Sequence, residues 1–194
     1  MSSELNPTRD RILKAAWTLL EDGASQVRMS DIAKAAGISR QALYLHFPNR
    51  ADLLVATTRH IDAVNRVDAL LAPSREARSG QERLETFITS WASHLPNIQG
   101  VARALIAMQE SDVEARRAWA DRMAALREGC AAAVAALAQD GRLDPGHSQA
   151  SATDWLMMLL AVPNWTFLTR DCGWNSEQYR QHVIEAARRS LMTR

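Results

Sequence analysis

Residues 30–50, SDIAKAAGISRQALYLHFPNR, contain two short stretches of helical pattern separated by a single glycine. Isolated helices of this length are marginal in water, so a chain keeps them only where other elements support them. A helix-turn-helix needs such an arrangement, because its second helix must protrude from a small support to enter the DNA major groove. The segment therefore predicts a DNA-binding element.

Composition limits the class of protein around this element. At 194 residues the chain is long enough for one large or two small domains with a core that needs neither disulfides nor metal. Cys130 and Cys172 form neither a CxxC pair nor a zinc-like spacing, which predicts reduced thiols, no structural metal and no cofactor. The start MSSELNPTRD lacks an apolar signal region, and the apolar run from Trp155 to Val162 is too short to span a bilayer. We therefore expect a soluble cytoplasmic protein without membrane contact.

The charge balance argues against a protein that coats nucleic acid over its whole surface. The formal net charge is only +1 at pH 7. Residues 1–50 carry seven basic against five acidic side chains, so they have a weak positive excess. Any contact with DNA must therefore be local.

Apolar residues recur at three- and four-residue spacing almost throughout, and β-branched runs are scarce, which predicts an all-α fold of about nine helices. The polar segment PSREARSGQ reads as a linker. The expected helices span about residues 8–22, 30–36, 39–47, 49–72, 80–94, 97–110, 112–139, 147–170 and 176–192.

Within the helix-turn-helix, Ser30 and Ser39 are expected to cap the two short helices, and Gly37 allows the left-handed turn between them. Leu43 and Phe47 lie one turn apart and should anchor the second helix to its support. Its opposite side is then left free for a ligand.

That free side carries residue types suited to reading DNA. Arg40 can bond guanine bidentately, Gln41 can pair with adenine, and the Ala42 methyl can contact a thymine methyl. Alternatively, Arg40 and Gln41 only form a solvent-exposed face of the helix. Tyr44 would then pack at the edge of the helix, and His46 would cap its end. The candidate DNA-binding residues, including those expected at phosphates, are Arg28, Ser30, Ser39, Arg40, Gln41, Ala42, Tyr44, His46 and Arg50.

The stretch ILKAAWTLLEDGASQVRMSDIAKAAGISRQALYLHFPNRADLL resembles the N-terminal domain of the tetracycline-repressor (TetR) family of bacterial transcription regulators. The resemblance implies an all-helical homodimer with a DNA-binding domain at 1–50 and a ligand-binding and dimerisation domain at 51–194. Tyr44 and His46 match residues that commonly contact the DNA backbone in the family. Arg50 stands where the family usually has lysine, and Ser30 where it often has threonine.

The later helices are rich in aromatic and sulfur-containing side chains, which suit an adaptable cavity for a small apolar or aromatic ligand. Ordinary core packing is the alternative for each of them. Pro163 deprives the Leu159 carbonyl of its helical partner, and the resulting bend either opens room for a ligand or only accommodates packing. The candidate ligand-binding residues are Trp91, His94, Met108, Trp119, Met123, Trp155, Met158, Asn164, Trp165 and Phe167.

The helix around residue 158 is apolar nearly all round, so one core face cannot hide it, and it predicts a four-helix dimer interface with the last helix. Burial under other helices of the same chain is the alternative. The candidate interface residues are Trp155, Leu156, Leu159, Leu160, Val183, Ile184, Ala187 and Leu191.

Together these features predict a ligand-responsive repressor that binds a palindromic double-stranded DNA operator as a homodimer and is released by a small molecule. One alternative is a regulator of the same kind that is controlled by a protein partner. A more remote alternative is a helical enzyme that uses His94, His147 or His182 as an acid or base, although no carboxylate or nucleophile stands at a telling spacing from them.

Overall fold

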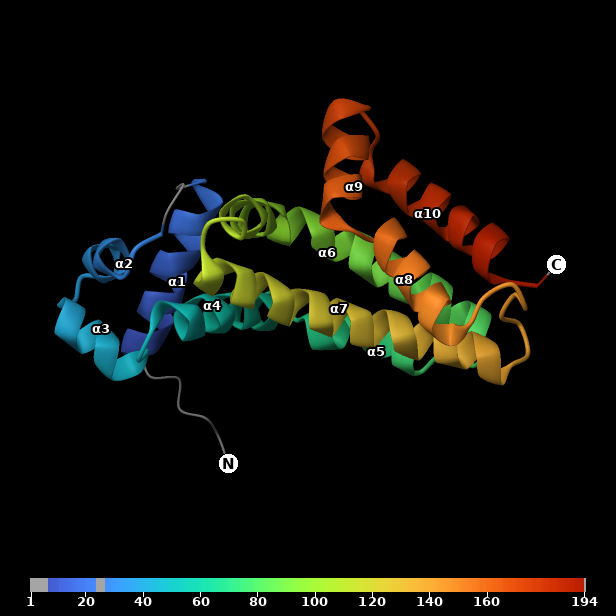
Figure 1. The fold of residues 1–194 in the computed structure, drawn as a ribbon, viewed down its shortest axis with the longest axis horizontal. Helices are drawn as coiled ribbons and strands as arrows, with labels where there is room; N and C mark the ends of the chain where they lie inside the picture. Colours follow the sequence, from blue (N-terminus) through green and yellow to red (C-terminus); the bar gives the residue numbers. More distant parts are fainter. Residues whose placement is uncertain (1–6, 24–26, 194) are drawn as a thin grey trace. The chain divides into compact units, whose positions relative to one another are not determined.

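The computed structural model describes residues 7–23 and 27–193, and within these residues the chain is helical without a β-strand. The all-α prediction is confirmed. None of the helices in this part of the chain is long and apolar enough to cross a membrane. In chain order (Figure 1), the elements are α1 (Pro7–Glu21), α2 (Met29–Ala35), α3 (Arg40–His46), α4 (Arg50–Val64), α5 (Val67–Arg75), α6 (Gly80–Met108), α7 (Val113–Gln139), α8 (Gln149–Leu159), α9 (Val162–Thr166), the π-helix η1 (Phe167–Asp171) and α10 (Ser176–Leu191).

The chain forms two compact units. The first comprises Met1–Val64 and Gly100–Arg122, and the second comprises Asn65–Gln99 and Met123–Arg194. The first unit contains the helix-turn-helix but extends well beyond the expected boundary at residue 50, because α4 and the α6–α7 turn belong to it. The functional division into 1–50 and 51–194 stays a proposal.

The first unit is held together by the apolar stripes of its short helices. α1 packs against α2 and α4, and the side chains of Ile12, Ile32, Leu43 and Leu53 are completely buried. Full burial of such a side chain contributes about 1.5–3 kcal/mol. The seven-residue helices α2 and α3 therefore gain their stability from this shared core and not from their own length.

The second unit has a separate core, to which α6, α7, α8 and α10 contribute. Buried residues include Leu84, Val134, Leu156 and Ala187, one from each of these helices. Gly80, at the start of α6, lies so close to the α7 backbone that a Cβ atom would come within 2.5 Å of the Leu137 nitrogen. Only glycine permits this approach.

Both cysteines are free thiols. Cys130 is buried and Cys172 is exposed. Burial raises the pKa of the Cys130 thiol to about 12, so it packs as a small apolar side chain.

The expected helix at 49–72 is two helices. α4 ends at Val64 and α5 begins at Val67, because Arg66 adopts a left-handed conformation with φ of 53°. α5 then continues through Pro73 to Arg75, so the expected linker is partly helical. Apolar spacing continues across residue 66, which is why the sequence did not reveal this break.

Pro96 does not separate two helices as expected. α6 runs without interruption from Gly80 to Met108 with Pro96 inside it. Proline removes one backbone hydrogen bond from a helix, but buried side chains continue on both sides, at Leu95 and Val101. The retained packing explains why the helix continues.

The expected helix at 147–170 is broken before Pro163. α8 ends at Leu159, Ala161 is extended, and α9 starts with Pro163 in its first turn; Figure 1 shows the chain changing direction there. Two side chains satisfy the freed carbonyl groups. The Tyr179 hydroxyl donates to the Leu159 oxygen at 3.3 Å, and the Trp91 indole Nε1 donates to the Leu160 oxygen at 2.9 Å.

Candidate nucleic-acid interface

The turn between α2 and α3 has the expected backbone geometry. Gly37 has φ of 66°, in the left-handed region that glycine tolerates best. The Ser39 hydroxyl accepts a hydrogen bond from the Ala42 amide at 3.1 Å and so caps α3. The capping prediction for Ser39 is confirmed. That for Ser30 is wrong, because Ser30 lies inside α2 and Arg28 occupies the N-cap position.

α3 divides into a buried and an exposed side. Leu43 and Phe47 are buried, as expected, and anchor the helix. Arg40, Gln41 and Tyr44 are exposed. This division leaves the first turn and one flank of α3 accessible to a ligand.

A shallow depression of about 480 Å³ brings together side chains from α2, α3 and the start of α4. Its lining includes five of the candidate DNA-binding residues: Arg28, Ser30, Arg40, Tyr44 and Arg50. Gln41, Ala42, Ser39 and His46 lie outside this lining. Even with Arg50 left out, Arg28 and Arg40 outnumber the one carboxylate of the lining, that of Glu114, so the depression suits an anion such as a phosphate.

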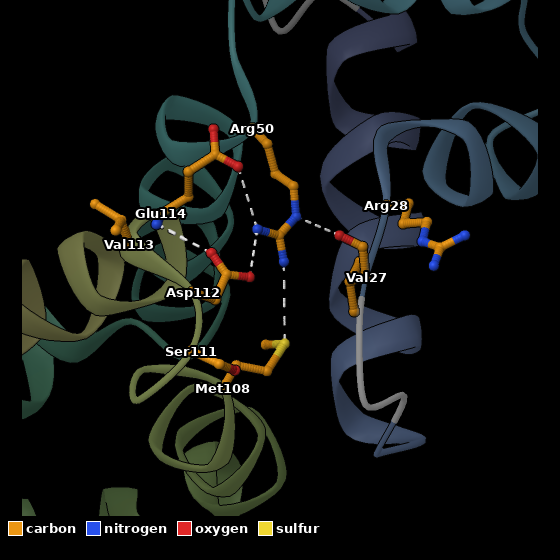
Figure 2. A pocket seen from close by; sticks show the side chains of 8 residues that line it. All are labelled: Val27, Arg28, Arg50, Met108, Ser111, Asp112, Val113 and Glu114. Carbon is orange, nitrogen blue, oxygen red and sulfur yellow. Dashed lines mark hydrogen bonds and ion pairs between the residues drawn. The ribbon is translucent and has the colours of Figure 1, made fainter.

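The Arg50 guanidinium is used inside the first unit, and only 12% of its side chain is exposed. Figure 2 shows it directed between the Val27 carbonyl and the α6–α7 turn. Nη1 lies 2.7 Å from Asp112 Oδ2 and 3.3 Å from Glu114 Oε2, Nε donates to the Val27 oxygen, and Nη2 lies 3.9 Å from Met108 Sδ. The Arg50 guanidinium, which was expected at a phosphate, therefore has several partners within the protein itself.

Asp112 is the principal anion of this cluster. Its Oδ1 accepts hydrogen bonds from the amides of Glu114 and Ala115 at the start of α7. Burial by itself would raise the pKa of Asp112, but the Ala115 amide and Arg50 outweigh burial and hold the pKa below its usual value. Asp112 is therefore charged at neutral pH and is a lasting partner for Arg50.

Leu45 is an exposed α3 residue that we did not expect at the interface. Its side chain is 84% exposed, although leucine usually packs inward. It follows Gln41 by four positions, so the two share one side of the helix. That spacing was the available signal. The partners of Arg50 had no comparable signal, because Val27 lies 23 positions away and Met108, Asp112 and Glu114 lie 58, 62 and 64 positions away.

The candidate ligand-binding residues are divided between the two units. Met108 and Trp119 belong to the first unit and the others to the second. Within the second unit, Trp91 lies 5.9 Å from His94 between ring centroids, and Asn164 donates to the Met158 carbonyl. By exposure, the set divides into buried His94, Met108 and Trp165, partly buried Trp91, Trp119, Met123 and Asn164, and exposed Trp155, Met158 and Phe167.

Most of the candidate dimer-interface residues are buried within the chain's own core. The buried ones are Leu156, Leu160, Val183, Ala187 and Leu191. Leu159 and Ile184 are partly exposed, and Trp155 is exposed. The Trp155 indole donates to Ser190 Oγ at 2.9 Å, which ties α8 to α10. For the five buried residues, the structure therefore agrees with the alternative that other helices of the same chain cover them.

The histidines considered for acid–base chemistry lie apart from one another along the chain. His94 is buried, and His182 Nδ1 lies 2.8 Å from the Gln178 oxygen in its own helix. His147 lies 3.5 Å from the Ser151 hydroxyl. Among the described residues no group of three or more His, Cys, Asp or Glu side chains is placed to hold a metal ion.

Comparison with known proteins supports the geometry. Residues 12–57 match the family model described as bacterial regulatory proteins, tetR family. The chain is 30% identical over 152 residues to the transcriptional regulator EthR of Mycobacterium tuberculosis, which covers 73% of this chain and 68% of EthR. These relatives are transcriptional regulators and not enzymes.

Two further similarities come from a curated relative and a solved structure. The nucleoid occlusion factor SlmA of Aliivibrio fischeri is 28% identical over 108 residues, which cover 54% of this chain. That match spans 55% of SlmA, so the chain covers about half the length of that relative. A transcriptional regulator from Saccharomonospora viridis, solved in complex with choline, has the same fold with a TM-score of 0.75 and 21% identity, covering 98% of this chain and 100% of that one.

Proposed function

Because the chain belongs to the TetR family of bacterial regulatory proteins, we propose that it is a repressor that binds a palindromic operator as a homodimer and is released by a small molecule. The observation that carries the proposal is the exposed side of α3. Arg40, Gln41, Tyr44 and Leu45 all face away from the core on a helix of seven residues. A helix presented in this way fits the major groove.

In the proposed complex, the two sides of α3 have different tasks. Arg40 and Gln41 contact base edges, where a good bidentate contact contributes about 1–3 kcal/mol of discrimination. Arg28, Ser30 and Tyr44, which line the cationic depression, contact phosphates and set the orientation of the helix. Arg50 supports this surface from behind and does not contact DNA.

We assign the dimer interface to the apolar side chains that the chain leaves uncovered. Trp155, Met158 and Phe167 are 43%, 42% and 57% exposed, and Leu159 of α8 and Ile184 of α10 are partly exposed. Large exposed apolar side chains on α8 and η1 favour contact with a second copy. A dimer would place two α3 helices about 34–36 Å apart, one DNA turn.

The support for a small ligand is a buried hydrogen-bond donor. Trp165 is only 5% exposed, and its indole Nε1 has no hydrogen-bond partner among the described residues. A buried donor without a partner costs about 1–3 kcal/mol, so an apolar ligand with one acceptor atom would gain by binding there. The related structure with choline supports small-molecule binding in this fold. If the ligand weakens operator binding, the operator must weaken ligand binding by the same factor.

Selection of bound DNA from a random duplex pool tests the DNA-binding proposal. We expect a palindromic sequence with half-sites one turn apart, bound with a steep loss of affinity at higher salt. Arg40→Ala should lower affinity for the selected sequence at least about fivefold. Arg170→Ala, which removes an equally charged exposed side chain from η1, should change it less than twofold. Sequence-indifferent binding by the wild-type protein would contradict the proposal.

Sedimentation and fluorescence test the other two parts. Met158→Glu should convert dimer to monomer and weaken operator binding, whereas Glu177→Gln on the exposed start of α10 should not. Small apolar compounds should shift tryptophan fluorescence and release the operator in wild-type protein, and Trp165→Phe should weaken both effects. If no compound acts while a protein partner forms a stable complex and releases the operator, control by a protein is the correct alternative.

A further inference from the structure

The carboxyl end of α3 is the weakest part of the proposed DNA-reading element. α3 has only seven residues, and the carbonyl groups in the last turn of a helix lack intrahelical partners. Its last backbone hydrogen bond joins the Phe47 amide to the Leu43 oxygen at 3.0 Å. Tyr44 and His46, both expected at phosphates, lie in this turn. Whatever holds the turn therefore holds these two side chains.

Arg9 of α1 reaches this end of α3 through two contacts. Its Nη1 donates to the His46 carbonyl oxygen at 3.1 Å, and its Cζ lies 4.1 Å from the centroid of the Phe47 ring. The first contact supplies a partner for a carbonyl at the negative end of the helix dipole. The second places a planar cation over the face of a ring that is 98% buried. One side chain thus ties α1 to both the last helical residue of α3 and its anchor.

We propose that Arg9 is a positioning residue for DNA recognition, which acts by holding the last turn of α3 and not by contacting DNA. The inference rests on the proposed function, because it assigns Arg9 a role in that binding. A guanidinium is required, since only a planar cation stacks on Phe47 and donates sideways to the His46 carbonyl at the same time. Lysine at this position would keep the charge but only one of the two contacts.

Hydrogen exchange without DNA tests the positioning role directly. In the whole 194-residue chain, Arg9→Met should speed exchange of the Phe47 amide about tenfold, because a cation–π contact and a charge-assisted hydrogen bond are lost. The Ile12 and Leu20 amides in α1 should be unchanged. Arg9→Lys should give an intermediate rate. Arg11→Met, which removes the same charge from an exposed position of α1, is the matched control and should leave the Phe47 amide unchanged.

Operator affinity and its salt dependence then separate positioning from direct contact. We expect Arg9→Met to weaken operator binding five- to tenfold while the slope of log affinity against log salt stays within about 0.3 of wild type. A residue that contacts phosphate would lower the slope by about 0.9. Weakened binding with that lower slope and unchanged exchange at Phe47 would overturn the inference, as would unchanged exchange and unchanged affinity.

The two proposals can fail separately. If the wild-type protein binds no DNA from the pool, the proposed function fails, while exchange at Phe47 still decides whether Arg9 holds α3. If the wild-type protein binds its operator and Arg9→Met leaves exchange and affinity unchanged, the function stands and the positioning role is wrong.

Discussion

Replacing Arg50 by methionine should destabilise the protein without removing a phosphate contact. Methionine keeps most of the aliphatic stem and removes the guanidinium that bonds to Val27, Asp112 and Glu114. From these contacts we expect the substitution mainly to lower the stability of the folded protein. The sequence pattern alone predicted the loss of a phosphate contact.

The magnitude follows from the burial of the pair. The side chains of Arg50 and Asp112 are 12% and 21% exposed, and their nearest atoms are 2.7 Å apart. A hydrogen bond to a charged group contributes about 1.5–3 kcal/mol, whereas exposed pairs contribute about 0–1 kcal/mol. Because this pair is largely but not fully buried, we expect Arg50→Met to lower the free energy of unfolding by about 2 kcal/mol. For a chain of this size the melting temperature should fall by about 4–8 °C.

Urea unfolding followed by tryptophan fluorescence measures this change, and a double-mutant cycle isolates the pair. Asp112→Asn keeps the side-chain oxygen that bonds to the Glu114 and Ala115 amides and removes only the charge. We expect a coupling free energy of about 1 kcal/mol between the two substitutions. Arg59→Met, which removes an exposed α4 arginine paired with Asp121, should cost less than about 0.5 kcal/mol.

One result would refute the reasoning. If Arg50→Met leaves the free energy of unfolding within about 0.5 kcal/mol of wild type and lowers the salt slope of operator binding by about 0.9, then Arg50 contacts phosphate and its internal contacts contribute little.

Three further predictions address other parts of the molecule. Tyr179→Phe should lower the free energy of unfolding, measured by urea unfolding, by about 1 kcal/mol, because the Leu159 carbonyl loses its donor. Burial raises the pKa of Tyr179, so its hydroxyl stays protonated and remains a donor. Tyr44→Phe, at an exposed position, is the control. The carboxylate of Asp112 has a pKa in the folded protein below its ordinary value of 3.8, so its contribution to stability is fully present above pH 3.8 and is lost as the pH falls through the folded pKa. A pH series of urea curves should show this loss reduced in Asp112→Asn. Leu45→Ala should weaken binding to an operator in which Leu45 contacts a thymine methyl, and replacing that thymine by deoxyuridine should weaken wild-type binding but not the variant; equal losses in both proteins would exclude the contact.

The recognition element could be predicted from the sequence because its signals are local. Ser39 caps α3, Gly37 makes the left-handed turn, and Leu43 and Phe47 anchor the helix, each within ten residues of the others. Capping, turn geometry and helical spacing depend on neighbours along the chain. The same signals identified the all-α fold and the family.

The helix breaks show where local signals fail. Pro96 was expected to end a helix, but α6 continues through it, whereas α8 ends before Pro163. The difference lies in distant partners. Trp91 and Tyr179 satisfy the carbonyl groups freed near Leu160, whereas buried side chains continue along α6 on both sides of Pro96, at Leu95 and Val101. A proline thus permits a break, and packing decides whether one forms.

By itself, the sequence determined that the chain is helical, that α3 has a buried and an exposed side, and which family it belongs to, because these depend on spacing and caps within a few turns. Only the tertiary structure decided the tasks of the long charged and apolar side chains. Arg9 and Arg50 look alike as surface bases, yet one lies on Phe47 and the other between Val27 and Asp112. Five of the eight apolar residues expected at a dimer interface are buried in the chain's own core. The physical reason is that a flexible side chain takes its partner from whatever the fold brings within reach, and that partner can lie sixty residues away.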